Sequence, residues 1–234
     1  MKILFISLGC DKNLADSEEM LGLLTGSGHE IVDSEEEAEA IVINTCCFIH
    51  DAKEESVNTI LEMAEYKKTG KCKALVVTGC MAQRYKEEIT QEIPEVDAVL
   101  GTTSYGDIVK ALNEVQAGHV FQEFRDINEL PEDSGRRVLT TGGHFGYLKI
   151  AEGCDKHCTY CIIPSLRGSF RSVPEERLLA QAEYMASQGV KELILVAQET
   201  TVYGTDLYGR KTLHILLKKL CQIRGIRWIR VLYC

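Results

Sequence analysis

The first half of the chain alternates short apolar runs with longer amphipathic stretches, and this alternation constrains the fold more than any other feature. The runs are rich in Val, Ile and Leu and cover residues 2–8, 30–32, 40–44, 74–78 and 98–100. Stretches with helical periodicity lie between them, at residues 14–24, 52–68, 83–92 and 105–117. In the second stretch, Val57, Ile60, Leu61 and Ala64 recur at the spacing of one helix face. Apolar strands separated by helices predict a parallel sheet that is covered on both faces.

The alternation resumes after residues 125–143, which are rich in polar residues and are interpreted as a linker. Strands are expected at 146–151, 192–197 and 227–232, and helices at 174–188 and 212–221. Pro174 suits the first turn of a helix, and Gly189 suits the position just past its end. We therefore predict an α/β protein. Its N-terminal domain, residues 1–124, is expected to be flavodoxin-like, and residues 144–234 are expected to begin a (β/α) barrel that is left incomplete.

Ten cysteines stand out in a chain of 234 residues with otherwise ordinary composition. Their density is below that of a disulfide scaffold, and the chain is long enough to bury a core without disulfides. No apolar segment has the length of a signal peptide or a membrane span, so a cytoplasmic location without membrane attachment is expected. The net charge of −9 disfavours nucleic acid as a partner and suits a basic one.

Three of the cysteines, Cys154, Cys158 and Cys161, are spaced C-x-x-x-C-x-x-C directly after a predicted strand. Three thiolates on one loop can bind three corners of an iron–sulfur cluster. A zinc site would need a fourth ligand, and His157 lies inside the loop between two of the cysteines. The spacing favours an iron–sulfur cluster over zinc, and either of them over three unconnected buried thiols.

A second set of cysteines is spread along the first half of the chain. Cys10, Cys46 and Cys80 each follow a predicted strand, and the carboxyl ends of parallel strands share one edge of a sheet. Gly9 and Gly79 precede two of them, and glycine lets the backbone approach a bulky group closely. These cysteines either form one site or are separate small buried residues. The remaining four are interpreted as structural or free thiols: Cys47, Cys72, Cys221 and Cys234.

Several motifs resemble those of known enzymes. The cysteine segment, with Tyr160 before its third cysteine, resembles the signature of the radical S-adenosylmethionine (SAM) superfamily. Four further motifs resemble the methylthiotransferase branch of that superfamily: Ser7-Leu8-Gly9-Cys10-Asp11-Lys12-Asn13, Asn44-Thr45-Cys46, Thr78-Gly79-Cys80 and Ile163-Pro164-Ser165-Leu166-Arg167-Gly168. Because the motifs occur in order along residues 1–234, the chain resembles the radical SAM methylthiotransferase family.

The resemblance implies two [4Fe–4S] clusters and SAM as cofactors. One cluster would be held by Cys154, Cys158 and Cys161, and the other by Cys10, Cys46 and Cys80. Cys47 stands where small residues such as Gly are common in the family, which leaves open which of Cys46 and Cys47 is the ligand.

The resemblance also implies residues that contact SAM. Gln198 and Glu199 end a predicted strand where the superfamily contacts the SAM amino group. Tyr160 would meet the adenine, or else pack against the protein. Arg167 would pair with a carboxylate, or else lie on a solvated surface.

Residues 7–13 resemble the branch of the family that acts on small-subunit ribosomal protein S12, whereas the transfer-RNA branch tends to have Gly-Cys-Gln-Met-Asn at this place. The implied reaction adds a methylthio group to the β-carbon of an aspartate, with SAM as radical source and methyl donor. The alternatives are a tRNA methylthiotransferase and a non-enzymatic iron–sulfur or zinc protein. An electron donor such as flavodoxin or ferredoxin is an implied partner. The family continues with further barrel strands and a TRAM domain, so the chain is expected to be truncated.

Overall fold

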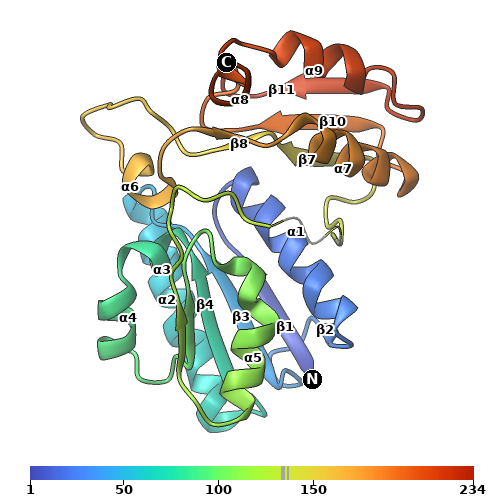
Figure 1. Cartoon of the computed structure of the whole chain (residues 1–234). Helices are drawn as coiled ribbons and strands as arrows, with labels where there is room; N and C mark the ends of the chain where they lie inside the picture. The colour runs from blue at the N-terminus through green and yellow to red at the C-terminus, as the bar shows by residue number, and fades with distance from the viewer. Residues whose placement is uncertain (133–134, 136) are drawn as a thin grey trace. The chain divides into compact units, whose positions relative to one another are not determined.

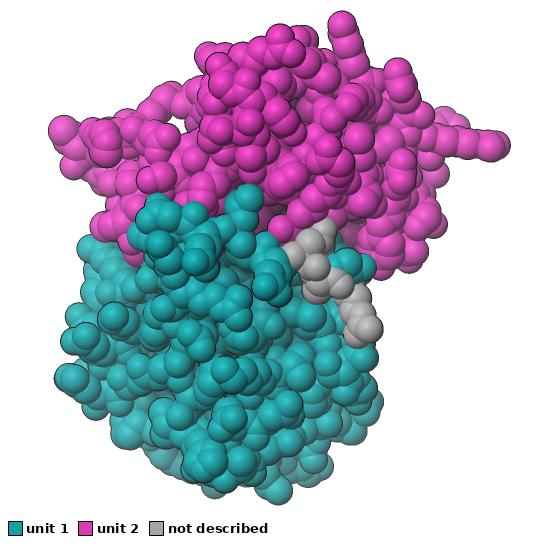
Figure 2. Space-filling model, viewed as in Figure 1, with its two compact units in different colours: residues 1–138 teal, residues 139–234 magenta. Residues whose placement is uncertain are grey.

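The computed structural model describes residues 1–132, 135 and 137–234, which form two compact units, Met1–Val138 and Leu139–Cys234 (Figure 2). The expected linker at residues 125–143 includes Asp133, Ser134 and Arg136, which lie outside the described residues. The predicted domain limits therefore stay predictions. The predicted α/β class is confirmed.

The N-terminal unit is built on a six-stranded parallel sheet with the strand order β2-β1-β3-β4-β5-β6 (Figure 1). The strands are β1 (Lys2–Ser7), β2 (Glu30–Val32), β3 (Ala40–Thr45), β4 (Ala74–Gly79), β5 (Ala98–Leu100) and β6 (Phe121–Glu123). The first five confirm the apolar runs, whereas the sequence does not predict β6. The order of these five is that of flavodoxin-like folds. The central strands β3 and β4 are buried along their whole length, as expected for parallel strands between two helical layers.

Helices cover both faces of this sheet (Figure 1). They are α1 (Asp11–Gly26), α2 (His50–Thr69), α3 (Cys80–Arg84), α4 (Lys86–Glu92), the short 3-10 helix η1 (Tyr105–Asp107) and α5 (Ile108–Gln116). On one face α1 and α5 supply Leu24 and Leu112 to a core that also contains Val42 and Val76 from the central strands. Alternate strand residues reach this core because successive side chains of a strand point to opposite faces.

Two helical predictions need correction. The single helix expected at residues 83–92 is two helices, α3 and α4, which are separated by Tyr85 with φ −122° and ψ 36°. The backbone therefore leaves the helical region at that residue. Leu61 is expected on the buried face of α2, but it is 48% exposed, while Ile60, Met63 and Ala64 are buried. Leu61 lies one residue, or about 100° of helix rotation, from Ile60, which is enough to place it beyond the edge of a narrow buried stripe.

The C-terminal unit contains a three-stranded parallel sheet with the order β11-β10-β7 and a two-stranded antiparallel sheet of β8 and β9. Its strands are β7 (Phe145–Lys149), β8 (Ala151–Glu152), β9 (Arg171–Ser172), β10 (Glu192–Val196) and β11 (Trp228–Val231). Its helices are α6 (Ile163–Arg167), α7 (Glu175–Ser187), α8 (Thr205–Tyr208) and α9 (Leu213–Leu220). The predicted strand–helix–strand–helix–strand series is confirmed, although the strand expected at 146–151 divides into β7 and β8. The sequence does not predict β9, α6 or α8, which are all short.

The signal predicted at the C-terminal end of α7 is confirmed, whereas the helix begins one residue later than predicted, so that Pro174 lies just before its first turn. Pro174 directly precedes its first residue, and Gly189 lies just past its end with φ +100°, a backbone conformation that favours glycine. Among the described residues, none of the helices combines the length and the apolar character needed to cross a membrane.

Candidate functional site

Three cysteines of the N-terminal unit follow β1, β3 and β4, which are neighbours in the sheet. Cys10 directly precedes α1, Cys46 comes directly after β3, and Cys80 is the first residue of α3. Because the strands are parallel, these positions share the carboxyl edge of the sheet, at the switch point between β1 and β3. The backbone of Gly9 lies so close to Cys46 that a Cβ atom on Gly9 would be 2.6 Å from its Cβ and 2.9 Å from its Sγ. The segment that carries Cys10 therefore packs directly against Cys46.

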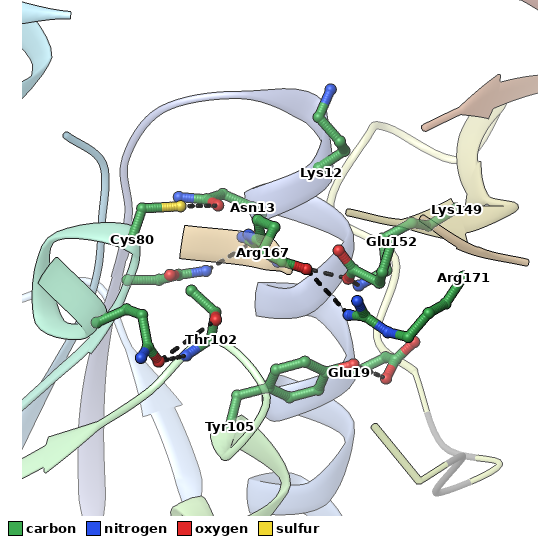
Figure 3. Close-up of polar contacts among 12 residues, drawn as sticks. Lys12, Asn13, Glu19, Cys80, Thr102, Tyr105, Lys149, Glu152, Arg167 and Arg171 are labelled. Atoms are coloured by element: carbon green, nitrogen blue, oxygen red, sulfur yellow. Dashed lines mark hydrogen bonds and ion pairs between the residues drawn. The ribbon is translucent and has the colours of Figure 1, made fainter. Parts of the chain in front are cut away.

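Asn13, on the first turn of α1, links the same strand ends. Its side-chain amide donates hydrogen bonds to the carbonyl oxygens of Leu8 (3.1 Å) and Thr45 (2.9 Å). Its Oδ1 accepts a hydrogen bond from the Sγ of Cys80 at 3.8 Å, and the two side chains face each other in Figure 3. One buried side chain thus contacts the last residue of β3 and the segments that follow β1 and β4. The sequence motif contains Asn13, but its role emerges only from these contacts.

The neighbouring residues Cys46 and Cys47 have different environments. The thiol of Cys47 donates a hydrogen bond to the carbonyl oxygen of Cys80 (3.3 Å), and burial raises the pKa of Cys47 to about 12. The Cys47 thiol is thus occupied by a backbone carbonyl oxygen, whereas the Sγ of Cys46 lies against the segment that carries Cys10. The Oγ of Ser56 accepts a hydrogen bond from the Cys46 N–H (3.0 Å) and donates one to the Cys46 carbonyl oxygen (2.8 Å), which fixes this backbone. These contacts favour Cys46 over Cys47 as a ligand.

The three candidate cluster ligands of the C-terminal unit, Cys154, Cys158 and Cys161, lie on the loop of residues 153–162, between β8 and α6. Cys154 and Cys161 are half-buried and Cys158 is exposed. The backbone N–H of Cys154 donates to the carbonyl oxygen of Gly168, and that of Cys161 donates to the carbonyl oxygen of Cys158, both at 3.0 Å. The loop is therefore folded on itself and held against the end of α6.

The start of this loop packs tightly on the backbone that follows α6. Gly153 has φ +72°, and a Cβ atom on it would lie 2.0 Å from the carbonyl oxygen of Ser169. Only glycine fits this position without a shift of the loop. The backbone N–H of Lys156 donates to the Sγ of Cys154 at 3.4 Å, so one cysteine sulfur already has a hydrogen-bond donor.

Glu152, the residue before this loop, is a buried carboxylate between two cations (Figure 3). It forms ion pairs with Lys149 and, at 3.4 Å, with Arg167. Burial alone would raise the pKa of Glu152, but Lys149 and Arg167 outweigh it and hold the pKa well below its usual value. Arg167, a predicted SAM contact, is therefore buried beside a carboxylate and does not lie on a solvated surface.

The other predicted SAM contacts differ in what surrounds them. Tyr160 is 88% exposed, so its ring is not packed in the protein. The Oε1 of Gln198 is buried and has no hydrogen-bond partner among the described residues. The carboxylate of Glu199 accepts a hydrogen bond from the Thr201 hydroxyl (2.7 Å) and pairs with the Lys156 ammonium at 2.5 Å. The Lys156 and Thr201 contacts lower the pKa of Glu199.

None of the ten cysteines, all of which lie among the described residues, forms a disulfide. Cys72 is buried, and burial raises its pKa, whereas Cys221 and Cys234 are exposed. Within the described part of the chain, no three His, Cys, Asp or Glu side chains lie close enough together to hold a single metal ion. The ligands of a four-iron cluster bind different irons, so such a cluster needs a wider arrangement than one ion does.

Comparison with protein-family models matches each unit to a different family. Residues 2–101 match the uncharacterized protein family UPF0004, and residues 148–233 match the radical SAM superfamily. Both candidate cysteine sets fall within these matches.

Curated proteins and solved structures give further similarities. The chain is 65% identical over 234 residues to a ribosomal protein uS12 methylthiotransferase RimO of Lachnoclostridium phytofermentans and 50% identical to one of Clostridium botulinum. All of this chain is covered in both comparisons, against 53% and 52% of the relatives, so the chain spans about half the length of the curated relatives it matches. A solved structure of the radical SAM methyltransferase TsrM from Kitasatospora setae matches 93% of this chain and 50% of its own, with a TM-score of 0.58 and 11% identity. At this identity the likeness concerns the fold alone.

Proposed function

We propose that the complete protein is a radical SAM methylthiotransferase like its curated relatives and that it transfers a methylthio group to ribosomal protein uS12. The acceptor would be the β-carbon of an aspartate. The match to the radical SAM superfamily implies a [4Fe–4S] cluster and SAM, and a flavodoxin or ferredoxin is the proposed electron donor.

The loop of the C-terminal unit fits the first cluster. Cys154, Cys158 and Cys161 supply three thiol ligands from one exposed loop, which leaves one iron without a protein ligand. When bound, this cluster and SAM supply the radical chemistry of the superfamily. The protein's own residues would orient SAM: Gln198 offers a buried amide oxygen with no hydrogen-bond partner among the described residues, which suits an ammonium donor. The exposed ring of Tyr160 is available to stack on a planar group.

The sheet edge of the N-terminal unit fits a second cluster. Cys10 leaves the end of β1, Cys46 follows β3 and Cys80 follows β4, while Asn13 and the close approach of Gly9 to Cys46 draw these segments together. We propose that these three cysteines hold a cluster with its own open iron, which would carry the sulfur to be transferred. The main support for the proposal is that these three cysteines lie together at one edge of the sheet, since a protein with one SAM cluster has no need of a second three-cysteine site.

Counting iron tests this assignment. After anaerobic reconstitution we expect about eight irons and eight sulfides per chain, because each proposed cluster has four of each. Cys10→Ala and Cys158→Ala should each lose about half of both. Cys221→Ala, which removes an exposed thiol outside both sites, should keep the full amount and serves as the matched control.

Other results would contradict the proposal. An unchanged iron count in Cys10→Ala would contradict the proposed second cluster. Zinc in place of iron and sulfide would support the non-enzymatic alternative.

The substrate is tested with the protein extended to the full length of its relatives. Incubated with SAM, a reductant and either uS12 or tRNA, it should add the mass of a methylthio group to uS12. The motif at residues 7–13 and the net charge of −9 favour this outcome, because a basic protein suits an acidic enzyme better than a polyanion does. A mass gain on tRNA alone would instead establish the tRNA methylthiotransferase.

A further inference from the structure

The two residues that follow the first cysteine of the loop both contact distant parts of the C-terminal unit. A carboxylate oxygen of Asp155 accepts a hydrogen bond from the backbone N–H of Phe170 at 2.8 Å. The ammonium of Lys156 pairs with the carboxylate of Glu199 at 2.5 Å. Neighbouring residues of one loop are thus tied to two different segments of the chain.

We propose that Asp155 and Lys156 are positioning residues that hold the loop of residues 153–162 in its cysteine-presenting conformation before any cofactor binds. The inference rests on the proposed cluster at Cys154, Cys158 and Cys161. It deepens that proposal by naming what keeps the three thiols in place.

The segment to which Asp155 is tied is itself anchored. Phe170 is buried and directly precedes β9, and Ser172 of β9 bonds to Asp206 through its backbone N–H (2.8 Å) and its hydroxyl (2.6 Å). The Ser172 hydroxyl also accepts a hydrogen bond from the N–H of Gly204 (2.8 Å). The anchor for Asp155 is therefore a part of the unit with little freedom to move.

The anchor for Lys156 is a different one. Glu199 follows β10, and its carboxylate is also held by the hydroxyl of Thr201 at 2.7 Å. Glu199 is only 15% exposed, whereas the Lys156 side chain is 64% exposed. We call these two contacts, Asp155 with the Phe170 N–H and Lys156 with Glu199, the tethers of the loop. Because they connect adjacent loop residues to segments beside two different strands, β9 and β10, they restrict both the position and the rotation of the loop.

The tethers also affect a cysteine sulfur. The backbone N–H of Lys156 donates to the Sγ of Cys154 at 3.4 Å, and this donor stays in place only while the loop keeps its shape. Hydrogen bonds to the sulfurs of a cluster set its reduction potential by stabilising the extra negative charge of the reduced state. A loosened loop should therefore shift the potential of a bound cluster to more negative values.

The two tethers differ in strength. A hydrogen bond from a backbone N–H to a carboxylate is charge-assisted, and its loss leaves the N–H of the buried Phe170 without this partner. In the ion pair of Lys156 with Glu199 the ammonium side is largely exposed, and water and salt weaken such a pair by screening it. Removing Asp155 should have the larger effect.

Hydrogen exchange on the chain without cofactors tests the tethers directly. In Asp155→Ala we expect residues 153–162 and the Phe170 amide to exchange at least about tenfold faster. In Lys156→Met the loop should exchange about two- to fivefold faster, and this difference should disappear at high salt. Lys219→Met is the matched control, because it removes a similarly exposed ammonium from an ion pair with Glu175 between α9 and α7. It should leave the loop unchanged.

A second measurement separates positioning from general stability. In the reconstituted protein, Asp155→Ala should lower the reduction potential of the cluster on the loop and speed the loss of its iron to a chelator. Asp155→Asn keeps a hydrogen-bond acceptor and Lys156→Arg keeps a cation. Both variants should therefore have a reduction potential and a rate of iron loss close to those of the wild type.

The outcomes distinguish this inference from the proposed function. Wild-type exchange of the loop in both Asp155→Ala and Lys156→Met, or an unchanged potential in Asp155→Ala, would overturn the tethers while leaving the cluster assignment intact. Faster exchange in a protein that binds no iron on this loop would support the tethers as a loop restraint and overturn the cluster assignment.

Discussion

In the C-terminal unit three cysteines lie on a single loop, whereas in the N-terminal unit three cysteines come from the ends of separate strands. The loop cysteines are near one another by sequence, and what the structure adds is a set of contacts that shape the loop. The sheet-edge cysteines are near one another only when β1, β3 and β4 pair in the correct order. We therefore expect that the loop site can be lost with little change in the stability of its unit, whereas the sheet-edge site cannot. Substitutions of single glycines test this difference.

The largest effect is expected at the sheet edge. Gly79 ends β4 with φ +92°, and a Cβ atom on it would lie 2.3 Å from Asn44 Oδ1 and 2.5 Å from the carbonyl oxygen of Thr45. Gly79→Ala combines a strained backbone with a clash at the edge of a central strand, so we expect a loss of about 2–5 kcal/mol in the free energy of unfolding. Urea denaturation of the N-terminal unit measures this loss. The same variant should lose about half of the iron.

Gly28→Ala is the matched control in the same unit. Gly28 has φ +84°, but nothing lies within 4 Å of an added Cβ atom. Its cost should be limited to backbone strain of about 1–2 kcal/mol, and its iron content should stay at the wild-type level. Equal losses in the two variants would show that the clash at Gly79 contributes nothing and that the strand ends tolerate rearrangement.

The second-largest effect is expected on the loop of the C-terminal unit, where a substitution should disrupt the cluster site with little loss of stability. Gly153→Ala places a Cβ atom 2.0 Å from the carbonyl oxygen of Ser169, so the loop of residues 153–162 must shift. Because the loop lies between elements and contributes no strand to either sheet, we expect a loss of stability of about 1–2 kcal/mol or less. We also expect the loss of about half of the iron. Gly209→Ala, with φ +67° and open space around its Cβ position, should keep its iron. Unfolding of the C-terminal unit by Gly153→Ala would contradict the proposed separation of site and stability.

The same contrast explains how far the sequence predicts the molecule. The strands of the N-terminal unit are predictable because β3 and β4 are buried on both faces and so consist of uninterrupted apolar residues. The position of each cysteine after a strand follows from the same pattern. The break at Tyr85 is not predictable, because residues 83–92 keep helical periodicity on both sides of it.

Contacts between distant residues are the part that the sequence does not reveal. Asp155 and Lys156 read as ordinary polar loop residues, since their partners Phe170 and Glu199 lie on other elements. The burial of Arg167 depends in the same way on Glu152, which lies one residue past the strand predicted at 146–151. Local patterns thus predict elements and candidate ligands, whereas the supporting contacts require the fold.

The smallest effect concerns Cys47 and sharpens the assignment of the sheet-edge site. Burial raises the pKa of this thiol from 9.0 to about 12, so the unfolded chain ionises at lower pH than the folded protein does. Its contribution to stability is therefore present below pH 9 and is lost as the pH rises from 9 toward 12. Cys47→Ser removes this titration, so between pH 9 and 11 the variant should lose about 1–2 kcal/mol less than the wild type in urea denaturation.

Cys221→Ser, which makes the same thiol-to-hydroxyl exchange at an exposed position, is the control. If the stability of Cys47→Ser has the same pH dependence as that of the wild type, the buried, protonated thiol is contradicted.

The iron content of Cys47→Ser decides whether Cys46 or Cys47 is the cluster ligand. If Cys46 binds the cluster, the count stays at the wild-type value, because the hydrogen bond from Cys47 to the Cys80 carbonyl oxygen is a contact that serine can replace. If Cys47 binds it, the count falls by about half, and the sheet-edge site would have to rearrange around a residue that this structure holds as a buried thiol.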